Sequence, residues 1–356
     1  MKKKKVFFIL PTFNTGGVER VTLNIINSLN TELFDIYLII CSGSSKLLPY
    51  IEKYINIIEL KNQNVRSSSF DIWKLLRKHN PEIVFTSFDH LSLLLLTMKI
   101  IGGFNYKTVV RLNTLVSNKL ESNLRGCIYN LFFKNLINKS DYIIAQTIEM
   151  KKDVLSTYNL KDEKVIVIHN IVNTEQIKIL SEEKLTIFDS NYINILSVGS
   201  LGEVKGYDLL IKSMVEVLKS NNRYRLYIVG NNRELYGDYK SYLSDLINKL
   251  NLEGYVFLLG GKSNPYPYMK NADVFVLSSR KEGFPNVVLE ALSLGTPCVV
   301  TNCVDFSSII EPNVNGIIIE KNNVRAITTG IINSKNIERF EFNVKNFDYN
   351  NWFSSF

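Results

Sequence analysis

The stretch VFVLSSRKEGFPNVVLEALSLGTPCVVT, residues 274–301, decides the fold of this chain. Residues 274–277 form a short apolar run, typical of a strand that is covered on both faces. A turn with Gly283 follows, and Pro285 is expected at the first position of a helix, where a missing N–H costs little. Gly295 predicts the end of that helix, and a second buried strand follows directly.

This stretch contains two carboxylates, Glu282 in the turn and Glu290 on the helix, eight positions apart. Phosphorylated ligands of α/β proteins bind at the carboxyl ends of strands, where the N–H groups that begin a helix favour anions. A carboxylate accepts hydrogen bonds from hydroxyl groups, so the pair suits a ligand with both sugar hydroxyls and phosphate. The alternative is two surface glutamates on an ordinary strand–helix unit.

The same alternation of apolar strands and amphipathic helices runs through most of the chain, and it predicts parallel sheets with helices on both faces. The alternation of strand and helix patterns is weaker between residues 174 and 191, which indicates a domain boundary. The expected strands are residues 6–10, 36–41, 57–60, 82–85, 108–111, 142–145, 165–168, 193–198, 225–229, 256–259 and 274–277, with another beginning at 299.

A length of 356 residues predicts two domains of ordinary size. We expect a first domain over residues 1–178, a linker over 179–192 and a second domain over 193–340. The final segment, 341–356, is rich in aromatic residues and is expected to pack back towards the first domain.

The composition is that of a globular protein, with 46% hydrophobic and 21% charged residues. A net charge of +8 favours an acidic partner, either a phosphorylated substrate or anionic lipid. No long arginine-rich block occurs, so we expect no nucleic-acid partner. Four cysteines without a C-x-x-C pair predict reduced, mostly buried thiols in a cytosolic protein and no structural zinc.

The N-terminus has basic residues before an apolar run, as a signal peptide does. The run, residues 6–10, ends before Pro11 and is too short for a signal peptide. Residues 91–101 are apolar, yet they are only about half of the ~20 residues that a bilayer requires. We therefore expect a cytoplasmic protein that is soluble or lies on the inner face of the cytoplasmic membrane.

Residues 117–139 predict an amphipathic helix, with Leu124, Ile128, Leu131 and Phe132 on one side and basic residues elsewhere. One interpretation is a helix that packs this side on the core and exposes a basic face. The other is a helix that lies on an anionic membrane.

Two loops have the form of phosphate-binding turns. Gly16 and Gly17 separate an apolar strand from a helix, although a plain turn fits equally well. Lys205 lies in a glycine-bounded loop before a helix, where a mobile cation beside N–H donors suits a diphosphate. An ordinary exposed lysine is the alternative.

The chain offers little equipment for acid–base or metal chemistry. It has three histidines, of which His90 follows a strand and is a candidate for substrate contact, with a structural role as the alternative. No D-x-D pair stands at the end of a strand to hold a divalent ion. We expect neither a metal nor a cofactor.

The stretch EGFPNVVLEALSLGTPCVV resembles the E-x7-E signature of retaining glycosyltransferases of family 4. That family has the GT-B fold, in which two Rossmann-like doubly wound domains face each other across a cleft. The G-S-L-x3-K-G loop at 199–206 and GGVERVTLNIINSL near the N-terminus are similar to two further landmarks of the family. The resemblance covers nearly the whole chain, and these motifs most resemble bacterial transferases that build capsule, O-antigen or related lipid-linked glycans.

The resemblance implies a role for each matching position. Glu290 would hold the nucleotide ribose, Glu282 would face the donor sugar, and Lys205 would neutralise the leaving diphosphate. The amides of residues 283–284 would bind sugar hydroxyls, and those of 287–288 would lie near the phosphates. The implied donor site consists of Gly16, Gly17, Ser200, Lys205, Glu282, Gly283, Phe284, Pro285, Asn286, Val287, Val288 and Glu290, with Glu282 and Lys205 as catalytic residues.

Two positions depart from the family pattern. Ser200 stands where arginine is common, so Arg280 or another residue would have to supply a second cation. Asn113 stands where many members carry histidine, and asparagine can hydrogen-bond a sugar hydroxyl but cannot titrate. Asn113 and Arg111 join His90 as candidates for contacts with acceptor or sugar.

The resemblance implies a metal-independent hexosyltransferase. It would move a sugar from a nucleoside diphosphate sugar, expected to be UDP-linked, to a glycan or polyprenyl-diphosphate-linked acceptor, with retention at the anomeric carbon. The second domain would bind the donor and the first the acceptor. Two alternatives stay open, a UDP-sugar epimerase of the same fold and a non-catalytic bilobal sugar-nucleotide-binding protein.

Overall fold

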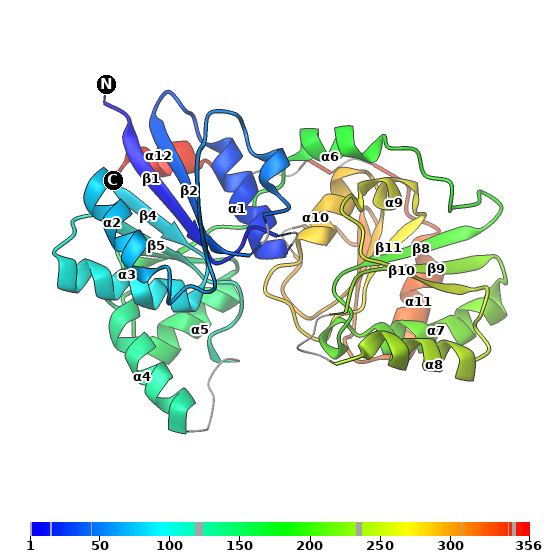
Figure 1. The fold of residues 1–356 in the computed structure, drawn as a ribbon. Coiled ribbons are helices and arrows are strands. Elements are labelled where there is room, and N and C mark those ends of the chain that lie inside the picture. The colour runs from blue at the N-terminus through cyan, green and yellow to red at the C-terminus, as the bar shows by residue number, and fades with distance from the viewer. Residues whose placement is uncertain are drawn as a thin grey trace. The chain divides into compact units, whose positions relative to one another are not determined.

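The chain folds into two compact α/β units (Figure 1). The first unit contains residues 1–171 and 346–356, and the second contains residues 172–345. The structure is a computed structural model that describes residues 2–14, 16–43, 45–117, 124–232, 237–307, 309–340, 342–343 and 347–356, without the side chains of 124–129.

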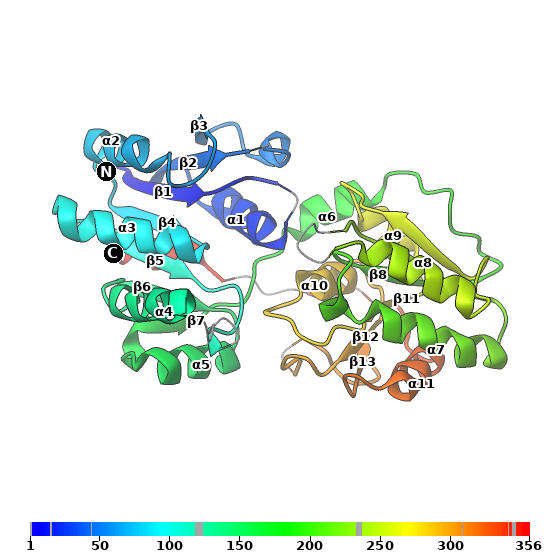
Figure 2. The same cartoon turned by 60° about the horizontal axis from the view of Figure 1, so that its bottom comes forward.

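The first unit is built on a parallel sheet of seven strands in the order β3-β2-β1-β4-β5-β6-β7 (Figure 2). Each strand lies where the sequence predicts one, because each contains a short β-branched or aromatic run, which is largely buried in every strand except the edge strand β3. The strands are β1 (Lys4–Leu10), β2 (Phe34–Ser42), β3 (Asn56–Asn62), β4 (Ile83–Thr86), β5 (Lys107–Arg111), β6 (Tyr142–Ala145) and β7 (Val165–Val167).

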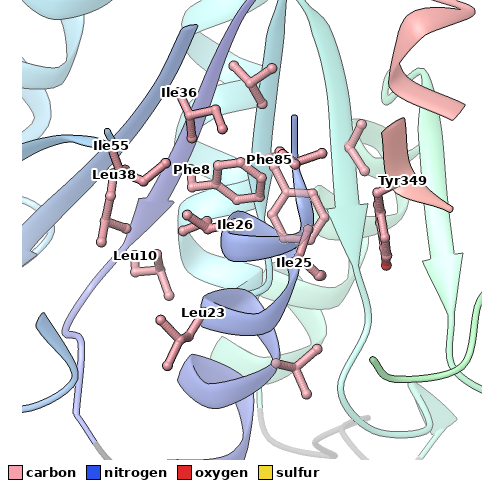
Figure 3. Packing of buried hydrophobic residues seen from close by; sticks show 14 of the residues in the cluster. Phe8, Leu10, Leu23, Ile25, Ile26, Ile36, Leu38, Ile55, Phe85 and Tyr349 are labelled. Carbon is pink, nitrogen blue, oxygen red and sulfur yellow. The ribbon is translucent and has the colours of Figure 1, made fainter. Parts of the chain in front are cut away.

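Helices cover both faces of this sheet. Neighbouring side chains of a strand point to opposite faces, so Phe8 packs in one cluster with Ile26 of the first helix (Figure 3). Phe7 packs on the other face, in one cluster with Ile72 and Leu95. The helical elements of the unit are α1 (Gly17–Ser28), η1 (Leu48–Tyr50), α2 (Ser69–His79), α3 (Asp89–Gly102), α4 (Leu124–Ile137), α5 (Ile148–Tyr158), η3 (Asp162–Lys164) and α12 (Tyr349–Ser354).

The last helix, α12, returns to the first unit and packs in the same cluster as α1. Tyr349 and Phe353 are buried there, as Figure 3 shows for Tyr349. The ring of Tyr142 on β6 lies 5.5 Å from that of Trp352 and stacks on Phe356 at 4.5 Å. The aromatic side chains therefore fix the C-terminal segment on the first unit, although the whole second unit lies between them in the sequence.

Helix α4 presents a different face from the one expected. Its buried side chains include Phe133 and Ile137, which are one helical turn apart and pack with β5 and β6. Leu131 and Phe132, expected on the side that packs on the core, are each 61% exposed. The core-facing interpretation is therefore wrong for these two residues, and the part of the expected helix at 118–123 lies outside the described residues.

The second unit has a parallel sheet of six strands in the order β10-β9-β8-β11-β12-β13. Its elements are α6 (Thr174–Ser181), β8 (Ile193–Val198), η4 (Glu203–Lys205), α7 (Tyr207–Ser220), β9 (Tyr224–Val229), α8 (Tyr239–Lys249), β10 (Val256–Gly260), α9 (Tyr266–Asn271), β11 (Val274–Leu277), α10 (Asn286–Ser293), β12 (Cys298–Thr301), β13 (Gly316–Ile319) and α11 (Val324–Ser334). Helices α7 and α11 pack on one face, while α9 and α10 pack on the other. Pro285 had been expected as the first residue of α10, but it is the N-cap of that helix, which begins at Asn286.

The division between the units falls earlier than the sequence predicts. It lies between Ile171 and Val172, whereas the first domain was expected to extend to 178 and the linker to 192. The difference arises because α6 is an amphipathic helix whose apolar side joins the core of the second unit, next to α9 and α10. Residues 174–181 of the stretch with the weak strand–helix pattern are therefore a helix of the second unit, while residues 182–192 form neither helix nor strand.

We expect Phe353→Ala to destabilise the first unit by about 3–5 kcal/mol, because the ring is buried and its removal leaves a cavity. Phe340→Ala is the matched control, since Phe340 is 46% exposed, and it should change stability by less than about 0.5 kcal/mol. Chemical denaturation followed by circular dichroism measures both. Equal effects of the two substitutions would contradict the packing of α12.

Candidate functional site

The candidate site of the second unit lies where strands β8 and β11 are neighbours. The two strands pair in parallel, with Val274 opposite Ile195 and Phe275 opposite Leu196. The chain leaves β8 towards β9 and leaves β11 towards β12, on opposite sides, so this is the point where the strand order reverses. In open α/β sheets, ligands bind at such a point outside the carboxyl ends of the strands.

The two loops at this point bring Lys205 and Glu282 together. Lys205 Nζ lies 2.6 Å from Glu282 Oε1, with side-chain exposures of 22% and 12%. The same oxygen accepts a hydrogen bond of 2.6 Å from Ser279 Oγ. Both predicted catalytic residues are therefore adjacent, and they neutralise each other.

Arg280 holds the Lys205 loop in place. Its guanidinium makes a bidentate pair with Asp208, with Nη1–Oδ1 2.8 Å and Nη2–Oδ2 2.9 Å, and also donates to the carbonyl oxygen of Glu203. Its backbone N–H donates to the carbonyl oxygen of Val204 at 2.7 Å. The charge of Arg280 is thus paired with Asp208, and the expectation that Arg280 or another residue supplies a second cation stays a prediction.

The surroundings of Asp208 and Arg280 favour the ionised forms of both side chains. Burial alone raises the pKa of Asp208, but the hydrogen bonds and charge of Arg280, together with the charge of Lys212, outweigh burial and hold that pKa below its usual value. The hydrogen bonds from Asp208 correspondingly raise the pKa of Arg280. The pair therefore stays ionised over the physiological range of pH.

A glycine allows the two loops to approach closely. Gly206 adopts a left-handed φ of 65°, and a Cβ there would lie 2.1 Å from the carbonyl oxygen of Ser278. The Oγ of Ser278 donates to the carbonyl oxygen of Lys205 at 2.9 Å. A larger residue at position 206 would push the Lys205 loop away from the β11–α10 loop.

The helix after the Glu282 turn carries the second carboxylate. Glu290 lies on α10 and is buried. Of the amides expected near the phosphates, that of Val288 already donates to the carbonyl oxygen of Pro285 at 3.0 Å, whereas that of Val287 belongs to the first turn, where N–H groups lack helical partners. Gly283 and Asn286 of this turn are half-buried, and Phe284 and Pro285 are buried, while Ser200 is half-buried in the loop that follows β8. Their contacts with a donor stay predictions.

The other predicted residues belong to the first unit. Gly16 caps α1 and Gly17 begins it. His90 is exposed near the start of α3, and partial burial of its ring lowers its pKa, an effect that Asp89 opposes. The expected approach of Gly16 and Gly17 to a diphosphate stays a prediction.

Arg111 and Asn113 form a buried polar network at the carboxyl ends of β5 and β6. Arg111 is 2% exposed, and its guanidinium donates to the amide oxygens of Asn113, at 2.6 Å, and of Asn170. The amide of Asn113 also donates to the carbonyl oxygen of Ser87, and Gln146 donates to that of Leu112 at 2.7 Å. Burial lowers the pKa of Arg111 to about 10. A contact of this network with an acceptor stays a prediction.

The cysteine side chains that the structure describes are free thiols. Cys41 and Cys298 are buried and Cys303 is half-buried, all three without a disulfide, while the side chain of Cys127 lies outside the described residues. Within the described part of the chain, no helix is long and apolar enough to cross a bilayer.

Comparison with known proteins identifies the family. The profile for glycosyl transferases group 1 matches residues 160–345, and that for glycosyltransferase family 4 matches residues 15–176. The chain belongs to the group 1 glycosyl transferases and is a family 4-type glycosyltransferase. Its two parallel-sheet units have the GT-B fold.

Several relatives of this glycosyltransferase are similar over most of its length. An uncharacterised glycosyltransferase of Methanocaldococcus jannaschii is 33% identical over 66% of the chain, which spans 59% of that relative's length. An uncharacterised glycosyltransferase of Haemophilus influenzae is 29% identical over 92% of the chain and 89% of its own length. An N-acetylgalactosaminyltransferase of Campylobacter jejuni, named for a diphospho-undecaprenol-linked substrate, is 26% identical over the same shares.

Solved structures share the fold of this glycosyltransferase. Anabaena HepE in complex with UDP superimposes with a TM-score of 0.76 and 18% identity, over 94% of this chain and 91% of HepE. Sucrose-phosphate synthase of Thermosynechococcus elongatus gives 0.73 and 14% identity, over 93% and 89% of the two chains.

Sequence reasoning missed three side chains that support the Lys205 and Glu282 loops and the Arg111 network. Asp208 follows the Lys205 loop, and an acidic residue in a first helical turn was the available signal, although it is also common at ordinary helix starts. Ser279 and Gln146 gave no signal, because a single hydroxyl or amide beside a strand has many structural uses. Only their partners, distant in the sequence, assign them to these sites.

We expect Asp208→Asn to destabilise the second unit by about 2 kcal/mol at neutral pH, since the change removes charge-assisted bonds from the partly exposed Arg280. The lowered folded-state pKa means that the ionised Asp208 stabilises the fold above its unfolded pKa of about 4 and ceases to do so as the pH falls through its folded pKa.

Urea denaturation of both proteins between neutral and acidic pH measures this difference, which should shrink below about pH 4. Asp245→Asn removes an exposed carboxylate from α8 and is the control, with little effect expected at any pH. A difference for Asp208→Asn that is independent of pH would contradict the ionised pair.

Proposed function

We propose that this glycosyltransferase moves a sugar from a UDP-sugar to a lipid-linked glycan acceptor, with retention at the anomeric carbon and without a metal ion. The observation that carries this proposal is the convergence of Lys205, Glu282 and α10 at the switch point between β8 and β11. A cation, a carboxylate and the start of a helix in one place match a ligand that combines diphosphate with sugar hydroxyls.

The names of similar proteins support the choice of substrates. A relative in Escherichia coli, 27% identical over 89% of the chain, is named as a galactosyltransferase that uses UDP-Gal and a diphosphoundecaprenol-linked GlcNAc. A Staphylococcus aureus relative, 24% identical over 93% of the chain, is named for capsular polysaccharide biosynthesis. Anabaena HepE has been solved with UDP-glucose. We infer a UDP-linked donor and an acceptor on a polyprenyl diphosphate.

The proposed reaction is a front-face displacement. The acceptor oxygen forms a bond to the anomeric carbon, while the bond from that carbon to the diphosphate oxygen breaks and its electron pair stays on UDP. The acceptor proton moves to a phosphate oxygen of the departing UDP. Lys205 and the first amides of α10 would stabilise the negative charge that develops there, which is usually the largest contribution to catalysis.

Isothermal titration of UDP and GDP in the presence of EDTA tests the donor site. We expect UDP to bind the wild type, and Glu290→Ala to weaken UDP binding by about ten- to a hundredfold, because the ribose hydroxyls would lose the buried carboxylate that accepts their hydrogen bonds. Glu253→Ala, at an exposed position outside the site, should bind UDP as the wild type does.

Release of free UDP separates the alternative functions. Release that requires an acceptor indicates transfer, whereas conversion of the donor without release indicates an epimerase. A wild type that binds neither UDP nor GDP would overturn the assignment of the donor site, and loss of binding in EDTA would overturn metal independence.

We also propose that α4 contacts the cytoplasmic membrane that holds the acceptor. It exposes Leu131 and Phe132, close in sequence to Lys134, and α3, which contacts α4, exposes Ile100 and Ile101 near its C-terminal end. Apolar side chains flanked by lysine are typical of helices that lie on anionic lipid.

Co-sedimentation with vesicles that contain phosphatidylglycerol measures this contact. The double substitution Leu131→Ser and Phe132→Ser should reduce binding by about tenfold, because two exposed apolar side chains no longer enter the lipid. Ile179→Ser, which removes a side chain 73% exposed on α6, is the control. Equal binding by all three proteins would contradict the role of α4.

A further inference from the structure

We propose that Glu282 and the diphosphate of the donor compete for Lys205, so that donor binding exchanges one anion for another on the same ammonium group. This inference rests on the proposed donor site and adds a consequence for its selectivity. The carboxylate released from Lys205 becomes available to hydroxyl groups of the donor sugar. Glu282 thereby couples recognition of the sugar to binding of the diphosphate.

The first observation is the ion pair itself. Lys205 Nζ and Glu282 Oε1 are 2.6 Å apart, and both side chains are largely removed from water. At that distance and burial, the pair satisfies the charge of Lys205 more fully than a surface ion pair would. A diphosphate that binds Lys205 therefore has to replace an existing partner.

The second observation is that Arg280 cannot take the place of Lys205. Both of its terminal nitrogens are bound to Asp208, and Nη1 also donates to the carbonyl oxygen of Glu203. Asp208 is itself buried, at 6% exposure, so separating the two would leave this carboxylate with only the weaker contacts of Lys212 Nζ at 3.7 Å and Tyr239 Oη at 3.3 Å. The diphosphate thus draws its positive charge from Lys205 while Arg280 stays with Asp208.

The third observation concerns the groups around Lys205. The loop that contains Lys205 also carries the hydroxyl of Ser200, and the start of α10 supplies amides such as that of Val287. These groups donate hydrogen bonds to phosphate oxygens, but they carry no full charge. They can hold a diphosphate without competing with Lys205 for its neutralisation.

The exchange has opposite consequences for UDP and for a UDP-sugar. When Lys205 turns to the diphosphate, Glu282 keeps the hydrogen bond from Ser279 but loses its counter-ion in a site where it is only 12% exposed. A buried carboxylate without enough donors is costly. UDP alone leaves this cost uncompensated, whereas a sugar supplies hydroxyl donors to Glu282.

The same competition favours product release. Once the sugar has been transferred, Glu282 has lost the hydroxyl donors that compensated it. Its return to Lys205 then displaces UDP, so the enzyme holds its donor more tightly than its nucleotide product. The selectivity arises from one residue that changes partner, without any movement of the backbone.

Titration calorimetry with UDP as the probe tests this exchange. We expect Glu282→Gln to bind UDP about three- to tenfold more tightly than the wild type, because glutamine keeps the shape and the bond from Ser279 but does not compete for Lys205. Transfer activity should fall in the same variant, since the amide is a weaker acceptor for sugar hydroxyls.

A double-substitution cycle separates competition from a general loosening of the site. Lys205→Met should weaken UDP binding, and adding Glu282→Gln to it should bring no further gain, because the cation for which the two anions compete is absent. Glu216→Gln is the control for net charge, since it removes an exposed carboxylate that pairs with Lys219 on α7. Circular dichroism and thermal melting check that each variant is folded. If Glu282→Gln does not fold, Glu282→Asp replaces it. This variant keeps the negative charge and should bind UDP as weakly as the wild type.

The outcomes distinguish this inference from the proposed function. Tighter UDP binding by Glu282→Gln that disappears in the Lys205→Met background supports the exchange. Unchanged or weaker binding by Glu282→Gln, or a gain that persists without Lys205, overturns the exchange while leaving the donor site in place. A wild type that does not bind UDP overturns both.

Discussion

Backbone hydrogen bonds between strands β8 and β11 bring together two loops whose interacting residues, Lys205 and Glu282, are 77 positions apart. Parallel pairing places the carboxyl ends of both strands at one edge of the sheet, so the loops that follow them have to meet. Gly206 allows the approach, since a Cβ there would collide with the carbonyl oxygen of Ser278. The lysine, the carboxylate and the start of α10 are neighbours because of this strand pairing.

The paired charges give the site its chemical character. Arg280 is bound to Asp208 and Lys205 to Glu282, so each of these two cations already has an anion. Ser200, in the same loop as Lys205, supplies a hydroxyl and no charge. If the donor diphosphate binds Lys205 as proposed, its affinity depends on whether Glu282 holds that cation, and this makes the partner of Lys205 a point of control.

Sequence patterns located the strands well because a buried parallel strand is a continuous apolar run, as in 274–277 and 193–198. They located helix faces less well. On α4, Leu131 and Phe132 seemed to share a side with other apolar residues, yet the core takes Phe133 and Ile137. Periodicity alone cannot choose between two overlapping apolar stripes, because the choice depends on which neighbouring element the helix packs against.

The sequence by itself determined the two α/β units and the glycine-bounded loops, and it selected Lys205, Glu282 and Glu290 as candidates for the site. Apolar runs, glycines and the spacing of the two glutamates are local properties of the chain. Only the tertiary structure decided the partners of these residues. Asp208 holds Arg280, α6 joins the second unit, and α12 returns to the first. Such pairings join segments far apart in the sequence, so they depend on how the strands are ordered in each sheet and on which surface each helix can cover.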